Sequence, residues 1–223
     1  MTITAVKIHD LRFPLGPSAG SDAIHRDPVY SYAVTELITS DGLSGNGFAF
    51  TLGEGNELVC QAAEFLASSL IGKPIDEIMA DFGRWQYHAS NEQQFRWLGP
   101  HKGVVHLALA SVTNACWDLW ARRKGLPLWK LLLELSSDDL LRTLDFSYVD
   151  DVLSRQQATD LLAKEYPSRS QRMGITQSGY PGYDTSIGWF NYTDEQVAAN
   201  VAKSADAGFT ALQREPFVGF GIA

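Results

Sequence analysis

The sequence predicts an α+β domain followed by the opening strand–helix–strand unit of a parallel α/β barrel or sheet. Three segments with strand-like alternation come first, and a series of segments with helical periodicity follows them. A short strand, a helix and a second short strand are expected after residue 179. A run of strands followed by a run of helices is typical of α+β domains, whereas strand–helix–strand connections are typical of parallel sheets.

The first three elements are expected to be strands. Apolar and polar residues alternate in each of them, over residues 3–13, 30–39 and 43–51. A segment rich in Gly, Pro, Ser and Asp separates the first two strands and is expected to form a loop, from Pro14 to Pro28. Asp41 and Gly42 both tolerate positive φ, so they predict a hairpin between the second and third strands.

The next segment is expected to be helical, with its main helix beginning near Gly103. Shorter helices are expected after Asn56 and over residues 76–88. The long helix carries an apolar stripe of Val105, Leu109, Val112, Cys116 and Leu119. Beside it runs a stripe of small residues that lets a neighbouring element approach closely, namely Ala108, Ser111 and Ala115. Gly125 is placed to end this helix, and Pro127 to begin the next one.

The C-terminal part contains a well-defined helix start. Thr193 and Gln196 have the spacing of a capping box, in which each side chain accepts a hydrogen bond from the backbone amide of the other residue. Gly208 is placed to end this helix, and the flanking strands are expected over residues 180–185 and 209–212.

The expected domain boundaries follow changes in composition. Residues 136–178 are polar and weakly patterned, apart from a charged helical stretch around Gln156 to Glu165. The predicted organisation is a first domain over residues 1–135, a connecting insertion over 136–178 and the start of a barrel over 179–223.

Composition and charge exclude several classes of partner. The chain has 223 residues, a net charge of −8 and no long basic run, so nucleic acid and anionic membranes are not expected as partners. The first residues alternate instead of forming a basic and then an apolar segment, and no run is apolar enough to span a bilayer. A cytoplasmic protein is therefore expected. Cys60 and Cys116 lie in apolar helical patterns and are expected to be reduced thiols.

Several other residues suggest chemistry, but each has a simpler structural interpretation. His101 and His106 stand near the start of the long helix with no carboxylate or cysteine at ligand spacing, so we expect them at the helix entry or core edge. Asp118 lies one helical turn from Arg122, which predicts a structural ion pair or hydrogen bond. The segment Gly53-Glu54-Gly55 lacks the rest of a phosphate-binding loop and predicts a turn.

A set of longer motifs resembles one protein family. They stand in order between about residues 10 and 212: Arg12-Phe13-Pro14, Gly20-Ser21-Asp22-Ala23, Asp27-Pro28 before Tyr30, Phe50-Thr51-Leu52-Gly53, Phe95-Arg96-Trp97-Leu98-Gly99-Pro100, Trp117-Asp118-Leu119 and Gly179-Tyr180-Pro181. The chain resembles the enolase superfamily, in its mandelate racemase/muconate lactonizing enzyme-like group, and looks most like the L-fuconate and L-galactonate dehydratases. The resemblance implies an α+β N-terminal capping domain followed by the first part of an incomplete (β/α)8 TIM-type barrel.

The resemblance also implies an activity and a binding loop. Family members use Mg²⁺ to dehydrate a small-molecule sugar acid, such as L-fuconate, L-galactonate or a similar aldonate, to a 2-keto-3-deoxy acid. The metal stabilises the enediolate that forms when the proton beside the carboxylate is removed. Gly20, Ser21, Asp22 and Tyr30 match the capping-loop positions that contact substrate. Family members commonly associate, which makes a homo-oligomer a candidate state.

The sequence departs from the family at its C-terminal end. Where the family has a Lys-x-Lys pair on the second barrel strand, this chain has Gln213 and Glu215, and neither can replace a lysine. Arg214 stays protonated and is a poor base, and residues 213–223 form a divergent tail. A full barrel takes roughly 250 residues, whereas 45 residues run from 179 to 223. We therefore expect a truncated chain that contains no catalytic residue or metal ligand, binds no Mg²⁺ and is inactive alone.

Three hypotheses remain open from the sequence. The first is a sugar-acid dehydratase whose activity resides in a full-length protein. The second is a non-catalytic fragment, and the third is an assembly module that pairs with full-length subunits. Mg²⁺-dependent formation of a 2-keto acid by the purified chain would contradict the second hypothesis, and no sequence feature argues for the third.

Overall fold

A computed structural model describes residues 2–16, 20–21, 24–98, 102–177, 179–189 and 192–214. Contacts within the chain divide it into two compact units. The first unit joins the residues up to Arg12 with Ser31–Gly174, and the second joins Phe13–Tyr30 with the residues from Ile175 onward. The chain therefore passes between the units at three places, two of which flank the loop between the first two strands.

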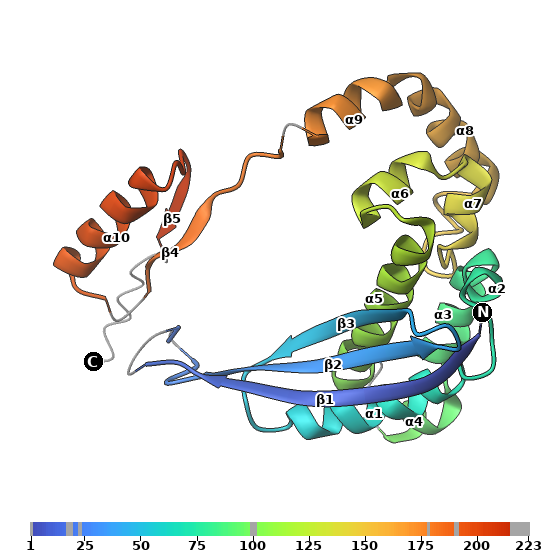
Figure 1. Cartoon of the computed structure of the whole chain (residues 1–223), viewed down its shortest axis with the longest axis horizontal. Helices are drawn as coiled ribbons and strands as arrows, with labels where there is room; N and C mark the ends of the chain where they lie inside the picture. The colour runs from blue at the N-terminus through green and yellow to red at the C-terminus, as the bar shows by residue number, and fades with distance from the viewer. Residues whose placement is uncertain are drawn as a thin grey trace. The chain divides into compact units, whose positions relative to one another are not determined.

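A three-stranded sheet forms the base of the first unit. Its strands are β1 (Ile3–Pro14), β2 (Val29–Thr39) and β3 (Ser44–Thr51), with β2 in the centre. The β2 and β3 strands pair antiparallel, and Gly42 in the hairpin between them has a φ of 85°, which confirms the predicted turn. Alternate residues of β2 are buried, because helices cover one face of the sheet (Figure 1).

Six helices follow the sheet in the chain: α1 (Asn56–Ser68), α2 (Ile75–Ala80), α3 (Phe82–Ser90), α4 (Gln93–Leu98), α5 (Val104–Lys124) and α6 (Leu128–Glu134). The helix expected over residues 76–88 is interrupted at Asp81, whose φ of −142° is not helical. Gly125 ends α5 in the left-handed conformation, as predicted, and Pro127 stands at the N-cap of α6.

The long helix α5 packs against β3 through its small-residue stripe. Ala108, Ser111 and Ala115 are fully buried there. The Ser111 hydroxyl lies 2.8 Å from the Ala33 carbonyl oxygen and 2.8 Å from the Thr35 hydroxyl, so it joins the helix to β2 as well. This packing confirms the predicted close approach between the long helix and a neighbouring element.

Residues after 135 are largely helical. They form α7 (Ser137–Arg142), α8 (Arg155–Glu165), the 3₁₀ turn η1 (Tyr166–Ser168) and α9 (Arg169–Gln177). The α7 helix packs on α3, where Gln86 Nε2 donates a 3.2 Å hydrogen bond to the Thr143 carbonyl oxygen. The first unit thus continues to Gly174 by its contacts. The boundaries placed from sequence at residues 135 and 178 stay predictions.

The C-terminal part of the second unit is a strand–helix–strand element. It consists of β4 (Asp184–Gly188), α10 (Asp194–Asp206) and β5 (Leu212–Arg214), and its two strands pair in parallel. Both strands lie later in the chain than the ranges 180–185 and 209–212 that the sequence predicts. The shift arises because glycine precedes both strands, at Gly182 and Gly208, and short apolar segments beside glycine do not fix where pairing begins.

The capping box at the start of α10 is confirmed. The Thr193 Oγ1 atom accepts a hydrogen bond from the Gln196 amide at 3.3 Å, and the Thr193 amide donates to Gln196 Oε1 at 2.8 Å. Thr193→Ala is expected to cost this helix about 1 kcal/mol, because the first turn loses a partner for its amide. Amide exchange over residues 194–206 measures the effect. Thr159→Ala, inside α8, is the control and should leave α10 unchanged.

Candidate functional site

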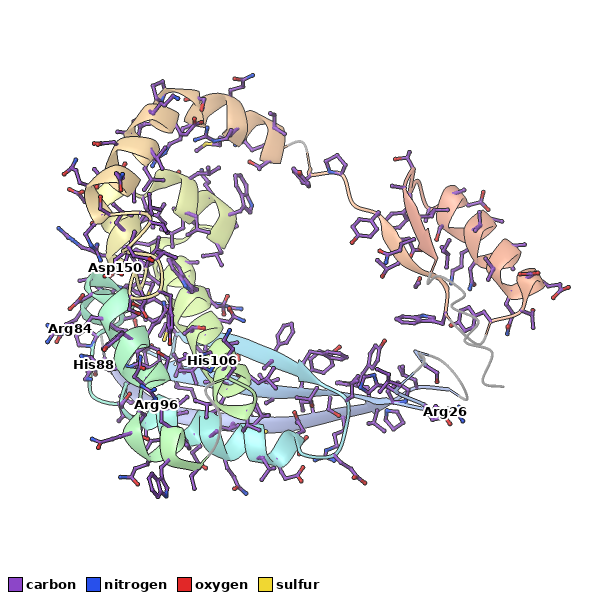
Figure 2. The ribbon with its side chains drawn as sticks, turned by 180° about the vertical axis from the view of Figure 1, so that it is seen from behind. Arg26, Arg84, His88, Arg96, His106 and Asp150 are labelled. Carbon is purple, nitrogen blue, oxygen red and sulfur yellow. The ribbon has the colours of Figure 1, made fainter. Side chains whose placement is uncertain are left out.

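The substrate-contacting residues expected from the sequence lie between β1 and β2 in the chain, apart from Tyr30, which is the second residue of β2. The loop leaves β1 after Pro14 and enters β2 at Val29. Two of the loop residues that the structure describes have positive φ, Gly20 at 67° and Asp27 at 48°. Aspartate is one of the few residue types other than glycine that adopt this conformation readily, as Asp27 does here. Arg26, which precedes it, is exposed and projects from the loop (Figure 2).

Gly20 and Tyr30 approach each other closely. A Cβ atom built on Gly20 would lie 3.0 Å from the Tyr30 hydroxyl oxygen and 2.7 Å from Leu15 Cδ1. A Cβ atom there would require the Leu15 and Tyr30 side chains to shift, and the positive φ of Gly20 also favours glycine. The Tyr30 hydroxyl therefore lies next to the Gly20 backbone.

Ser21 is buried, and its hydroxyl organises the loop. Its Oγ atom accepts a 3.0 Å hydrogen bond from the Asp27 amide, which closes the loop between these residues. A hydroxyl that accepts one hydrogen bond still has a proton to donate. The loop thus holds Gly20, Ser21 and Tyr30 in one short segment of structure, whereas Asp22 lies outside the described residues.

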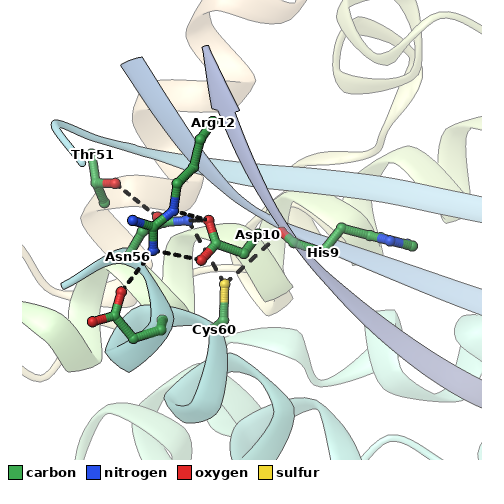
Figure 3. A network of polar contacts seen from close by, with 7 residues as sticks. His9, Asp10, Arg12, Thr51, Asn56 and Cys60 are labelled. Carbon is green, nitrogen blue, oxygen red and sulfur yellow. Dashed lines mark hydrogen bonds and ion pairs between the residues drawn. The ribbon is translucent and has the colours of Figure 1, made fainter. Parts of the chain in front are cut away.

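A polar cluster stands where β1 enters the loop, and the sequence does not predict the contacts between its members. We call Asp10, Arg12, Thr51, Asn56 and Glu57 the stem cluster (Figure 3). Arg12 binds Asp10 with two nitrogens, Nε at 2.9 Å and Nη2 at 2.7 Å, and its Nη2 also lies 2.7 Å from Glu57 Oε2. Asn56, which is fully buried, donates to Asp10 Oδ1 at 2.6 Å and accepts from the Thr51 hydroxyl at 2.7 Å.

The electrostatics of the stem cluster favour its charged form. The Arg12 guanidinium holds the pKa of the Asp10 carboxyl below its ordinary value. The pKa of Glu57 is also lowered, first by its own backbone amide at the start of α1 and then by Arg12. Both carboxylates raise the pKa of Arg12 in turn. The arrangement could have been suspected from Asp10 and Arg12, because residues two apart on a strand share a face.

The other candidate residues have structural roles or lie outside the described ranges. Asp118 accepts hydrogen bonds at 2.8 Å from both Arg122 Nε and the Asn46 amide, which confirms the predicted ion pair. Neither Cys60 nor Cys116 forms a disulfide, and burial raises the pKa of the Cys116 thiol. His106 lies on α5 (Figure 2), whereas His101 is not among the described residues.

The residues that the structure describes do not form a magnesium site. Over the described ranges, no three His, Cys, Asp or Glu side chains come together in a way that could hold a metal ion. Gln213, at the position where the resemblance implies a lysine, is an exposed residue of β5. No step of catalysis is therefore assigned to this chain through Mg²⁺. Among the helices that the structure describes, none is long and apolar enough to cross a membrane.

Residues 5–132 match the N-terminal domain of the mandelate racemase / muconate lactonizing enzyme family. The Bos taurus protein named mitochondrial enolase superfamily member 1 is 41% identical over 212 residues, which cover 93% of this chain and 48% of that protein. L-galactonate dehydratase from Hypocrea jecorina is 35% identical over 212 residues, which cover 94% of this chain and 47% of that protein. The chain thus spans about half the length of the curated relatives that it matches.

Solved structures show the same fold. The human mitochondrial enolase superfamily member 1 superposes with a TM-score of 0.90 at 38% identity, over 97% of this chain and 50% of that chain. L-talarate/galactarate dehydratase from Salmonella typhimurium LT2, solved with Mg and L-lyxarohydroxamate, gives a TM-score of 0.63 at 21% identity, over 96% and 44% of the two chains. The latter similarity shows the fold alone.

These matches identify the domain to which the first unit corresponds. Its three strands and following helices form the mixed α/β capping domain expected from the motifs. The described strand–helix–strand element agrees with the start of an incomplete barrel, since the human structure is covered over only half its length. The chain therefore belongs to the mandelate racemase / muconate lactonizing enzyme family of the enolase superfamily, and residues 5–132 are its N-terminal domain.

Proposed function

We propose that this chain is part of a sugar-acid dehydratase and that its loop between β1 and β2 contacts the hydroxyl groups of the sugar acid. The substrate class is L-galactonate, L-fuconate or a related aldonate, in line with the dehydratases among the relatives. The observation that carries the proposal is the loop geometry, in which Gly20, Ser21 and Tyr30 are held together. Hydroxyl and backbone groups of this kind suit a polyhydroxylated ligand, because each can donate or accept a hydrogen bond.

The loop's contribution is recognition rather than bond breaking. The reaction removes the proton beside the carboxylate and expels the β-hydroxyl, and Mg²⁺ would supply charge stabilisation in the complete family enzyme. The Tyr30 and Ser21 hydroxyls can orient the sugar chain and exclude water from it. Asp22 completes the proposed set of contacts, together with Gly20, as the family motif implies.

We expect no turnover by the 223-residue polypeptide alone, because Gln213 and Glu215 stand where the resemblance implies the catalytic lysines. The assay combines purified chain, Mg²⁺ and either L-galactonate or L-fuconate, and measures the 2-keto-3-deoxy acid formed. Formation of that product above the rate without protein would contradict the expectation of an inactive chain. Such product formation would still support L-galactonate, L-fuconate or a related aldonate as the substrate class.

Gly20→Ala tests the loop itself. The new methyl group would collide with Leu15 and with the Tyr30 hydroxyl, and positive φ disfavours alanine. Titration of L-galactonate into the chain, followed by NMR, should show at least a roughly tenfold weaker affinity, which corresponds to about 1.4 kcal/mol.

Gly16→Ala is the matched control in the same loop. A Cβ atom there meets nothing within 4 Å, and its φ is not positive. The affinity of this variant for L-galactonate should stay within about twofold of the wild type, in keeping with other surface substitutions. Equal binding by Gly20→Ala and the wild type, or no binding by the wild type at millimolar L-galactonate, would reject the proposed role of the loop.

A further inference from the structure

We infer that the strand–helix–strand element of the second unit carries a small binding site for an uncharged, polyhydroxylated ligand of monosaccharide size. The site is a cavity of about 270 Å³ beside β4 and α10. This volume lies just below the range of about 300–1,000 Å³ that is typical of sites for larger ligands. Its lining includes Asp184, Ser186, Asn200, Lys203, Ser204 and Phe209. The site is separate from the loop proposed above to contact the sugar acid, and it does not depend on that proposal.

Two elements that contact each other directly supply the polar side chains of the cavity. Asn200, Lys203 and Ser204 are spaced three and four residues apart on α10, so they share one face of the helix. Asp184 and Ser186 stand on β4, which lies alongside α10 (Figure 1). The cavity is therefore built within a single strand–helix–strand element.

Hydrogen bonds hold the Asp184 carboxylate in the wall of the cavity. Its Oδ1 atom accepts from the Ser186 amide at 2.8 Å and from the Ser186 hydroxyl at 2.7 Å, and its Oδ2 atom accepts from the hydroxyl of the buried Ser204. These bonds, first that from the Ser186 hydroxyl, lower the pKa of Asp184, so the carboxyl group is ionised at neutral pH. A carboxylate has about four acceptor sites, so the three donors that the structure describes leave about one for a ligand.

The neighbouring side chains offer further acceptors and one group of donors. The Ser186 and Ser204 hydroxyls donate to Asp184, so their oxygen atoms can accept from a ligand. Asn200 Nδ2 donates to a backbone carbonyl oxygen of β4 at 3.2 Å, which holds the amide and leaves its Oδ1 atom as an acceptor. The Lys203 ammonium group supplies donors. A ligand with several hydroxyl groups suits such a set, because each hydroxyl both donates and accepts.

The charges that line the cavity favour an uncharged ligand. Asp184 and Lys203 are the ionisable side chains in the lining, and their charges cancel. An anionic ligand is repelled by Asp184, and a cationic ligand is repelled by Lys203. Phe209 also lines the cavity and offers an aromatic surface to the carbon–hydrogen face of a sugar ring. These features favour a neutral monosaccharide over a sugar acid.

Titration of L-galactose into the 223-residue chain, followed by NMR, tests the site. L-galactose is the probe because it is uncharged and otherwise similar to L-galactonate. The amide signals of Asn200 and Ser204 should shift with a dissociation constant of about 1–10 mM, as expected for a small ligand held by a few hydrogen bonds. L-galactonate should bind at these residues roughly tenfold more weakly, because its carboxylate is repelled by Asp184.

Asp184→Asn removes the charged acceptor with almost no change in size. The affinity for L-galactose should fall roughly tenfold, because hydrogen bonds to a charged group are about twice as strong as those between neutral groups. Asp206→Asn is the matched control, since it makes the same change at the end of α10 but outside the lining of the cavity. Its affinity should stay within about twofold of the wild type. Amide exchange over residues 194–206 shows whether α10 stays folded in each variant.

Phe209→Leu tests the same site without removing a polar contact, which matters if Asp184→Asn loosens β4. The affinity for L-galactose should fall about threefold or more, because leucine offers no aromatic face. Equal affinity of Asp184→Asn and the wild type would overturn the inference. So would the absence of shifts at about 50 mM L-galactose, several times the expected dissociation constant.

The choice between the two ligands separates this inference from the proposed function. Tighter binding of L-galactonate than of L-galactose at Asn200 and Ser204 would also overturn the inference, because the charge argument would then be wrong. The Asp27 amide, which donates to Ser21 Oγ, reports on the other loop. No shift of Asp27 with L-galactonate would count against the proposed function, whereas shifts of Asn200 with L-galactose would still support the cavity as a binding site.

Discussion

Gly47→Ala is expected to destabilise the first unit by about 3 kcal/mol or more, the upper part of the range for overpacked cores. A Cβ atom on Gly47 would lie 2.2 Å from both the Ala115 amide nitrogen and the Ser111 carbonyl oxygen. Both are backbone atoms of α5, so no side chain can rotate away and the helix must move from the sheet. That movement would also weaken the buried contact between the Ser111 hydroxyl and the Ala33 carbonyl oxygen.

Urea unfolding followed by circular dichroism measures this loss. Typical domains have a free energy of unfolding of about 5–15 kcal/mol, so a loss of this size lowers the midpoint substantially. Gly174→Ala is the control, because it lies in α9 with nothing within 4 Å of the added Cβ atom. It should be neutral or stabilising by up to about 1 kcal/mol, since alanine favours helix. An unfolding midpoint for Gly47→Ala equal to that of the wild type would show that α5 does not pack on β3 as described.

This interface shows how far the sequence predicts the fold. The small residues of α5 predicted that some element would approach closely, but they did not identify that element. Gly45 and Gly47 indicate that the element is β3, because glycines two apart on a strand lie on the same face. A strand face without side chains and a helix face with small ones are complementary. Together these two features predict that α5 packs on β3.

Sequence signals that have a local steric or hydrogen-bonding cause predicted the positions of turns and helix ends accurately. The hairpin at Gly42, the end of α5 at Gly125 and the capping box at Thr193 all occur where the sequence placed them. The limits of β4 and β5 were displaced, because strand pairing depends on the partner strand as well as on local composition. The interruption at Asp81 was missed for a similar reason, since the bend lets α3 pack on α7.

The residues of the candidate site stay a prediction from the family motif, and their contacts with one another were not predicted from the sequence. The family motif selected Gly20, Ser21, Asp22 and Tyr30, and the structure places Tyr30, at the start of β2, beside Gly20 in the loop. No pattern in the sequence indicates that Ser21 accepts from the Asp27 amide, because such a bond depends on loop conformation. The contacts of the stem cluster could not be predicted from the sequence, for a different reason. Its members lie in three separate elements, and only the fold places Asn56 beside Asp10.

Phe82→Ala is expected to cost the first unit about 3–5 kcal/mol, the usual loss when a buried aromatic ring is removed. Phe82 is fully buried in α3. Its ring stacks parallel to that of Trp85 with centroids 5.6 Å apart, and it meets the Trp117 ring edge-on at 5.8 Å. The variant would lose both aromatic contacts and leave a cavity between α3 and α5 that the surrounding helices can fill only in part.

Tryptophan fluorescence and urea unfolding together test this prediction. The two tryptophans that touch Phe82 should change their emission in the folded variant, while the unfolding midpoint falls. Phe82→Leu should recover about half of the lost stability, because leucine fills part of the same space. Phe48→Ala on the exposed face of β3 is the control, at 56% exposure, and should cost about 1 kcal/mol or less. Equal losses for the buried and exposed phenylalanines would mean that Phe82 is not at the centre of the core, since burial is the property in which the two residues differ most.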